Sequence, residues 1–296
     1  MEEITKKIIH LQHCGAGWKS LYFLLKHQSN LDLLYHYSPS QLANILSISP
    51  LKANKLYNRM HSNKIETLLS TYAAKNIHFI PFFDSLYPKL LLTIPQPPWM
   101  LYAVGNLDLL KSNKIAFVGA RNGSDTGKRA IEKLLPPLLK ADFVVVSGLA
   151  RGIDTFVHQS VKKQKGRTIA VIAGGFFHIY PKENETLARE LVYNDLLLSE
   201  YPPCTQPARW QFPARNRIIS GLSLGTVVVQ AGKRSGSLIT AYYALEQGRE
   251  VFAVPGPIDD PLAEGTNELI TEGAKLVQNG EDILAELHPQ WLKIKD

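Results

Sequence analysis

The sequence predicts an α/β fold in which a mostly parallel, doubly wound sheet follows a small helical bundle. From residue 111 onward, short buried-strand patterns alternate with helical stretches, as they do in βαβ units. Such alternation is typical of a parallel sheet with helices on both faces. The first 75 residues instead carry short segments with apolar residues at helical spacing. The 296 residues, of which 45% are hydrophobic, suffice for one large domain or two modest ones.

The helical bundle is expected over residues 1–75, with candidate helices at 3–11, 17–27, 40–45, 50–62 and 63–74. The turn from His13 to Gly17 resembles a helix-hairpin-helix turn, whose backbone N–H groups bind phosphates, but a plain tight turn between two helices explains the pattern better. A sterile-alpha-motif-like bundle that serves protein contacts is a third alternative. The residue pattern leaves all three open.

Residues 76–110 differ in composition, because prolines at 81, 88, 95, 97 and 98 are mixed with tyrosine, phenylalanine and tryptophan. This segment is too apolar for a flexible linker. We expect an extended connection that lies on the following domain and contains one strand at residues 99–104.

Residues 111–296 are expected to form the main domain. Its strands are predicted at 115–118, 143–146, 168–172, 196–198, 226–229, 251–254 and 275–277. Of the residues after the last strand, 284–296 are too few for a C-terminal winged helix, so none is expected.

The loops that follow these strands carry glycine and hydroxyl residues together with cations. Because the carboxyl ends of parallel strands meet at one edge of a sheet, these loops should form one rim that binds a polyanion. A glycine in any single loop is explained by a turn alone, but five loops share the pattern. The candidates from these loops are Arg121, Ser147, Gly148, Gly152, Lys233, Ser235, Gly236 and Ser237.

A basic and aromatic stretch precedes a buried strand pattern and contains Arg209, Trp210, Phe212, Pro213, Arg215, Asn216 and Arg217. Pro213 can begin a helix, whose first turn would then present both later arginines to an anion. The alternative is that one of them pairs with Glu200. Phe212 or Trp210 could stack on a nucleobase, as rings do in single-strand-binding grooves, or could fill the core.

Composition excludes several other classes. The net charge of +7 lies in the first three-quarters of the chain, since residues 221–296 hold 6 basic and 11 acidic residues. No segment is apolar enough for a signal peptide or membrane span. Two cysteines without metal-ligand spacing fit the reducing cytoplasm. Neither a dinucleotide fingerprint nor a P-loop is present, and no acid–base pair stands out, so we expect no cofactor, metal or catalytic residue.

The stretch from Gly119 to Val277 resembles the DNA-processing protein A family, also called DprA or Smf. The matching segments are SGLARGID at 147–154, YPKEN at 180–184, LSEYPP at 198–203, FPARNRIISGLS at 212–223, SGSLIT at 235–240, VPG at 254–256 and GTNELI at 265–270. Residues 84–106 resemble the family's entry into its main domain. The similarity covers about two-thirds of the chain.

The resemblance implies an extended Rossmann-like fold and a cytoplasmic, non-catalytic protein that binds single-stranded DNA in natural transformation and competence. Such a protein protects incoming DNA during DNA processing and loads the RecA recombinase for DNA recombination. A homodimer is implied, and we expect its contacts in the C-terminal part of the main domain, with 280–287 as a candidate. The resemblance places Arg121, Arg209, Phe212, Arg215, Asn216, Arg217, Ser235, Gly236, Ser237 and Thr240 in the DNA site.

Residues 173–177 replace a turn that more usually contains Gly and Asp, and two further positions depart from the family pattern. Ala120 stands where Ser is common, and Gln230 stands where Glu is expected, which puts a carboxylate role there in doubt. One alternative function is an interaction scaffold that uses the helical N-terminus and binds no nucleic acid. The other is a nucleotide-processing hydrolase resembling the lysine-decarboxylase-like phosphoribohydrolases. Their catalytic loop carries a glutamate that residues 235–241 lack.

Overall fold

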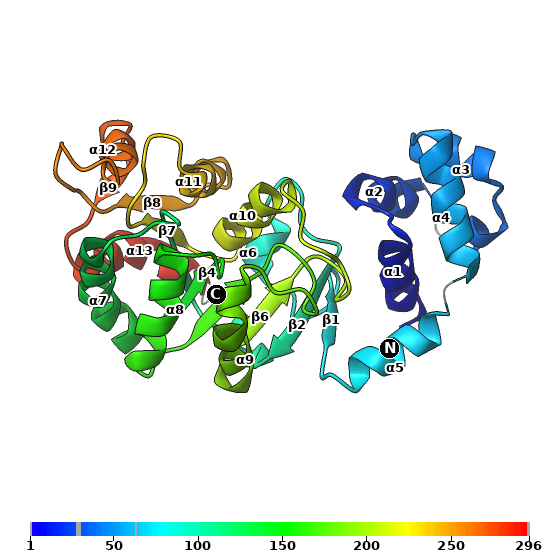
Figure 1. Cartoon of the computed structure of the whole chain (residues 1–296), viewed down its shortest axis with the longest axis horizontal. Helices are drawn as coiled ribbons and strands as arrows, with labels where there is room; N and C mark the ends of the chain where they lie inside the picture. The colour runs from blue at the N-terminus through cyan, green and yellow to red at the C-terminus, as the bar shows by residue number, and fades with distance from the viewer. Residues whose placement is uncertain (1, 28–30, 63, 295–296) are drawn as a thin grey trace.

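The computed structural model describes residues 2–27, 31–62 and 64–294. Its centre is a nine-stranded sheet of order β1-β2-β6-β5-β4-β3-β7-β8-β9 (Figure 1). Strands β1 and β2 pair antiparallel with each other, as β2 does with β6, and all other neighbours are parallel. The strands are β1 His78–Pro81, β2 Met100–Gly105, β3 Lys114–Val118, β4 Val144–Ser147, β5 Thr168–Val171, β6 Leu196–Ser199, β7 Gly225–Val228, β8 Glu250–Ala253 and β9 Lys275–Leu276.

The chain winds in two directions from β3. It passes through β4 and β5 to β6 on one side, then returns across the sheet to β7, which pairs with β3 in the register Ala116↔Thr226. The crossovers that leave β3 and β7 therefore diverge. In parallel sheets, a crevice for ligands opens at such a switch point, beyond the carboxyl ends of the strands.

Helices cover both faces of the sheet. One face carries α7 Asp125–Lys140, α8 Ile153–Lys163, α9 Glu185–Asn194 and α13 Gly280–Ile294, and the other carries α6 Lys89–Leu92, α10 Gln211–Gly221, α11 Gly236–Glu246 and α12 Glu264–Thr271. Alternate residues of β3 divide between the two cores: Phe117 packs with α7 and α8, while Val118 packs with α10 and α11. The predicted doubly wound fold is confirmed. No helix among the described residues is long and apolar enough to cross a membrane.

The N-terminal helices form a bundle beside β1 (Figure 1). They are α1 Glu3–Cys14, α2 Trp18–His27, α3 Pro39–Leu46, α4 Pro50–Ser62 and α5 Ile65–Ala73, with a 3-10 helix at Leu31–His36. The predicted start of the fifth helix, Asn63, lies outside the described residues, as do residues 295 and 296. The core of the bundle includes Met100 and Tyr102 of β2, and the Tyr102 hydroxyl donates to Oε1 of Gln12 at 2.9 Å.

The segment expected to be a connection contributes two strands to the sheet. Its predicted strand is β2, shifted by one residue, but β1 was not predicted from the sequence. Strand β1 is only four residues long, ends in Pro81 and, in the part of the chain that the structure describes, pairs with β2 alone. Proline is tolerated in such an edge strand, but in a sequence it argues against a strand, so β1 could not be recognised from the pattern.

His158 on α8 is a buried titratable group in the core of the sheet region. Its Nδ1 lies 2.8 Å from the hydroxyl of Thr168, and that hydroxyl donates to the carbonyl of Val145 at 2.7 Å. Nδ1 is therefore the protonated nitrogen, and Nε2 has no hydrogen-bond partner in the described structure. Burial lowers the pKa of His158 from 6.5 to about 3.

We expect this histidine to make the fold sensitive to acid. Between pH 6.5 and 3 the unfolded chain binds a proton at His158 that the folded chain does not. The free energy of unfolding should thus fall with falling pH, by about 1.4 kcal/mol per unit for this group. Urea denaturation between pH 7 and 5 should show a shallower fall for His158→Phe than for the wild type. An unchanged slope would contradict this assignment.

Candidate nucleic-acid interface

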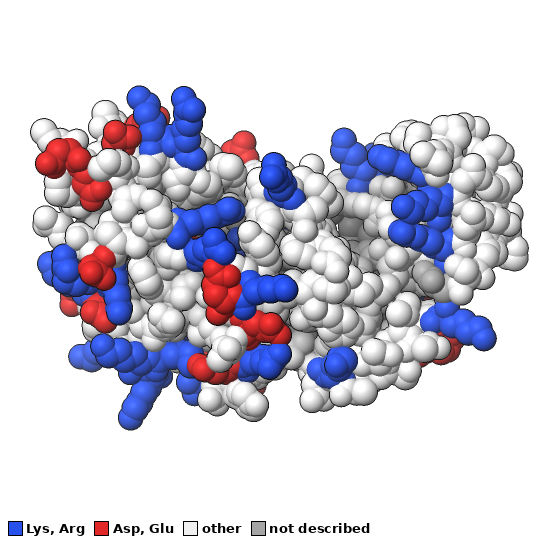
Figure 2. Space-filling model, viewed as in Figure 1, with Lys and Arg blue, Asp and Glu red and all other residues white. Residues whose placement is uncertain are grey.

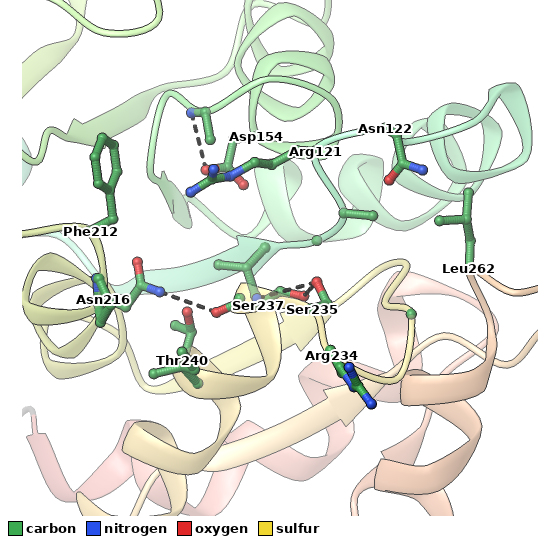
Figure 3. Close-up of a pocket in the computed structure, with 18 of the residues that line it drawn as sticks. Arg121, Asn122, Asp154, Phe212, Asn216, Arg234, Ser235, Ser237, Thr240 and Leu262 are labelled. Carbon is green, nitrogen blue, oxygen red and sulfur yellow. Dashed lines mark hydrogen bonds between the residues drawn. The ribbon is translucent and has the colours of Figure 1, made fainter. Parts of the chain in front are cut away.

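A pocket of about 610 Å³ opens at the switch point, beyond the ends of β3 and β7 (Figure 3). We call it the switch-point pocket. The loops after these two strands and the first turns of α10 and α11 supply its walls. It is lined by Val118, Gly119, Ala120, Arg121, Asn122, Ala150, Asp154, Phe212, Pro213, Arg215, Asn216, Ile219, Gly232, Lys233, Arg234, Ser235, Gly236, Ser237, Ile239, Thr240, Pro261 and Leu262.

The loop after β3 is held against the start of α8. Gly152 at the N-cap of α8 has φ +69°, and a Cβ there would lie 2.4 Å from the carbonyl oxygen of Ala120. Gln230, two residues after β7, holds the same loop in place: its Oε1 accepts from the Ser124 amide at 2.9 Å, and its Nε2 donates to the Ser124 hydroxyl at 2.8 Å. An amide both accepts and donates here, so Gln230 has a structural role. Together these contacts fix the position of Arg121.

Arg121 and Phe212 face each other across the mouth of the pocket. The Arg121 guanidinium carbon lies 5.5 Å from the centroid of the Phe212 ring, and Tyr180 meets that ring edge-on, also at 5.5 Å. Phe212 is half-buried rather than part of the core. Arg121 is exposed and forms no ion pair with a carboxylate of the described residues. Figure 3 shows Arg121 and Asn216 pointing into the pocket and Arg234 turned away from it.

Arg215 lies beneath the pocket instead of projecting into solvent. Its side chain is buried, and Nη1 donates to the carbonyls of Gly148 and Val171, where β4 and β5 end. A Cβ on Gly148 would lie 2.4 Å from that Nη1, so only glycine leaves room for the guanidinium. Burial lowers the pKa of Arg215 to about 10, and nearby Asp154 opposes the shift. Arg215 therefore keeps its positive charge at neutral pH, under the floor of the pocket.

Arg217 does not line the switch-point pocket, contrary to the prediction from the sequence. Helix α10 begins at Gln211 rather than at Pro213, and residues two positions apart on a helix point in nearly opposite directions. Arg217 instead donates from Nη2 to Glu200 at 2.6 Å, as the alternative interpretation had it. Burial raises the pKa of Glu200, and the charge of Arg217 opposes that rise.

The N-terminus of α11 opens onto the pocket. Ser235 caps this helix by accepting from the Ser237 amide at 3.4 Å, and the two hydroxyls lie 2.7 Å apart. Asn216 donates to the carbonyl of Gly236 at 3.3 Å, which ties α10 to this turn. Thr240 lines the wall, and Lys233 is exposed at the rim. Backbone N–H groups and a cation thus meet here, as they do in anion sites.

Two other predicted residues have different places. Ser147 is fully buried and donates to the carbonyl of Phe117 at 2.7 Å, so it holds β4 to β3 and does not line the pocket. Arg209 is exposed but does not line the pocket.

Sequence reasoning missed the contributions of Asn122, Arg234 and Leu262. Asn122 and Arg234 adjoin Arg121 and Lys233 in the loops already singled out, so their positions carried a signal. Leu262 lies near the end of the long loop between β8 and α12, and its sequence context carried no such signal.

Asp154 also lines the pocket, in the first turn of α8. It accepts from the amide of Ala150 at 3.2 Å, but it does not cap α8, because that helix begins at Ile153 with Gly152 at its N-cap. Burial raises its pKa, and the charge of Arg215 opposes that rise. In the described ranges, no group of three or more His, Cys, Asp or Glu residues is placed to hold a metal ion.

Comparisons with known proteins bear on this site. Residues 78–288 match the family model for DNA recombination-mediator protein A. The chain is 50% identical over 240 residues to DNA processing protein DprA from Bacillus subtilis, covering 80% of this chain and 81% of the relative. It is 48% identical over 218 residues to the Streptococcus pneumoniae protein of that name, covering 73% and 77%.

Two solved structures are similar to this chain, one over nearly its whole length and one over most of it. The X-ray structure of DNA processing protein A from Streptococcus pneumoniae has a TM-score of 0.84 at 40% identity, covering 97% of this chain and 99% of that one. A Helicobacter pylori structure has a TM-score of 0.65 at 30% identity, covering 72% and 96%. That second structure addresses the single-stranded DNA binding mode of its own protein.

The contacts of Gly152 predict how sensitive the site is to one added methyl group. Gly152→Ala should reduce the free energy of unfolding by about 1–3 kcal/mol, because its backbone conformation is nearly glycine-only and the Cβ would overlap Ala120. Gly236→Ala is the matched control, since its Cβ would meet nothing within 4 Å. Urea denaturation should show the loss only for Gly152→Ala, and equal stabilities would contradict this packing.

Proposed function

The chain belongs to the DNA recombination-mediator protein A family, and on that premise we propose that it binds single-stranded DNA in the switch-point pocket. The observation that carries the proposal is the guanidinium of Arg121 over the half-buried ring of Phe212, at the mouth of the pocket. A cation beside an aromatic ring suits an unpaired nucleotide, because the cation binds the phosphate and the ring stacks on the base. The Helicobacter pylori structure concerns single-stranded DNA binding by its own protein, which supports this proposal.

Each wall of the pocket has a role in this proposal. Arg121 and Lys233 neutralise phosphates from opposite loops, and the N-terminus of α11 offers its backbone N–H groups to a third. Phe212 stacks on a base. Arg215 contacts no phosphate directly, but its buried charge makes the floor attractive to anions.

Binding fits the pocket better than hydrolysis does. Among the described lining residues, Asp154 is the one carboxylate, and it is buried and already accepts a hydrogen bond from the Ala150 amide. The loop of residues 235–241 has no glutamate that could act as the phosphoribohydrolases' catalytic residue does. We therefore propose a DNA-binding role without catalysis.

The relatives are DNA processing proteins, and the family is described as a recombination mediator. We propose that this protein acts in the cytoplasm during natural transformation. There it would protect incoming single strands and help to load the RecA recombinase onto them. The support is the family membership together with the proposed strand-binding pocket.

We further propose a homodimer, formed through α11. This helix is apolar around much of its circumference, and Tyr242 and Leu245 on its outer side are 48% and 55% exposed. A helix of that kind is usually covered on more than one side. The segment first expected to form the contact, residues 280–287, uses Ile283 and Leu287 within the chain, where both pack against α7.

Substitutions at the mouth of the pocket should separate charge from stacking. Arg121→Ala should weaken binding of labelled oligothymidylate and make the slope of log affinity against log salt shallower by about 0.7, because one phosphate contact is lost. Phe212→Ala should cost about 1–3 kcal/mol of affinity from stacking and leave that slope unchanged.

Arg189→Ala is the charge-matched control, because Arg189 is exposed on α9 and pairs with Glu185. Fluorescence anisotropy at several salt concentrations measures all three variants. The proposal fails if Arg121→Ala and Phe212→Ala both bind as the control does, or if duplex DNA is preferred to single strands.

The dimer is tested by a charge on the exposed side of α11. Leu245→Glu should convert a two-chain particle into a single chain in light scattering, because a carboxylate cannot be buried there unpaired. Tyr193→Glu is the control, since Tyr193 is 82% exposed on α9, on the opposite face of the sheet. A wild-type protein that is monomeric at micromolar concentration would refute the dimer.

A further inference from the structure

A second groove, of about 470 Å³, separates the helical bundle from the sheet region. We call it the bundle groove. The turn between α1 and α2 forms one wall, and the start of α10 with the segment after β6 forms the other. Figure 2 shows a hollow between these two parts, with Lys and Arg side chains gathered over α2 and α4 beside it. The function proposed above makes no use of this groove.

Helix α10 is the wall that the two cavities share. Phe212, Asn216 and Ile219 line the switch-point pocket, whereas Trp210 and Arg217 line the bundle groove. Each set follows the spacing of one helix face, so the cavities lie on two sides of one helix. Trp210 is 66% exposed at the start of α10 and meets Tyr201 edge-on at 5.9 Å. A strand that leaves the pocket over the start of α10 therefore passes an exposed ring and enters the groove.

The opposite wall of the bundle groove is the turn between α1 and α2, whose sequence resembles a phosphate-binding helix-hairpin-helix turn. Gly15 has φ +101°, and the amides of Gly15 and Ala16 bond back to carbonyls at the end of α1. Helix α2 begins at Trp18, and the amides of its first turn lack partners within the helix. A Cβ on Gly15 would lie 3.3 Å from Nη1 of Arg59, so that exposed guanidinium lies over the turn.

Arg217 supplies an independent observation from the other wall. It is 9% exposed, lines the groove and uses Nη2 in its ion pair with Glu200. Its Nη1 has no hydrogen-bond partner in the described structure. A buried guanidinium rarely leaves a donor unused, because an unpaired buried donor costs about 1–3 kcal/mol. Two guanidiniums and a helix N-terminus thus border one groove.

We propose that the bundle groove holds a second stretch of the same single-stranded polynucleotide, whose first stretch occupies the switch-point pocket. Arg59 and the N-terminus of α2 bind its phosphates, and Trp210 stacks on a base between the two sites. The groove thereby gives the helical bundle a part in binding the strand. This inference rests on the proposed function of the pocket.

Oligonucleotide length separates the two sites. Oligothymidylates of about 4 and about 16 nucleotides span the range of known single-strand site sizes. The short one should fill the pocket alone, and the long one should also reach the groove. Gly17→Glu places a carboxylate in the groove where a Cβ meets nothing within 4 Å, and Gly17→Ala is its matched control. Gly17→Glu should weaken binding of the long oligomer about tenfold, the effect of one charge-assisted contact, without altering binding of the short one.

Arg59→Ala should weaken binding of the long oligomer alone and make its salt slope shallower by about 0.7. Lys26→Ala is the charge-matched control, since Lys26 is exposed near the end of α2 and lies outside the groove. Circular dichroism establishes that each variant is folded. If the short oligomer does not bind the wild type, the proposed function fails. If it binds but both groove variants match their controls with the long oligomer, the groove inference is overturned.

Discussion

The parallel pairing of β3 with β7 is the constraint on which the site depends. The chain leaves β6 at one side of the parallel strands and must cross the sheet to place β7 against β3. The segment that makes this crossing includes α10, so the crossing itself delivers Phe212 and Arg215 to the crevice that it creates. Without that return, the loop after β3 would face no second wall, and Arg121 would have no ring opposite it.

Helix α10 buries two positive charges for different purposes. On one side, Arg215 donates hydrogen bonds to the carbonyls where β4 and β5 end. On the other side, Arg217 forms an ion pair with Glu200. Buried charges are tolerated only with such partners, because desolvation costs several kcal/mol per ion. These two sets of contacts therefore prevent α10 from rotating about its own axis. That fixed rotation sets which of its residues face the pocket and which face the bundle groove.

The sequence was sufficient for the fold and for part of the site. The alternation of strand and helix patterns predicted β3 to β9, because parallel strands covered on both faces form apolar runs such as Val144–Ser147. Arg121, Phe212 and the Ser235 turn could be placed in one crevice, because strand ends meet at one edge. The direction of Arg217 could not be predicted, because it depends on where α10 begins and on a glutamate in a different loop. Strand β1 could not be predicted, because it is an edge strand that pairs with β2 and contains a proline, which in a sequence argues against a strand.

The two ends of the sheet are shielded unequally. At one end the helical bundle sits beside β1, and its core extends onto β2, so a strand from another molecule meets helices and a terminal proline there. At the other end β9 offers only two residues, which is too little backbone for a stable ladder. Edge-to-edge association of sheets from different molecules is thus disfavoured at both edges. At β1 the helical bundle covers the edge, and at β9 the strand is too short to pair.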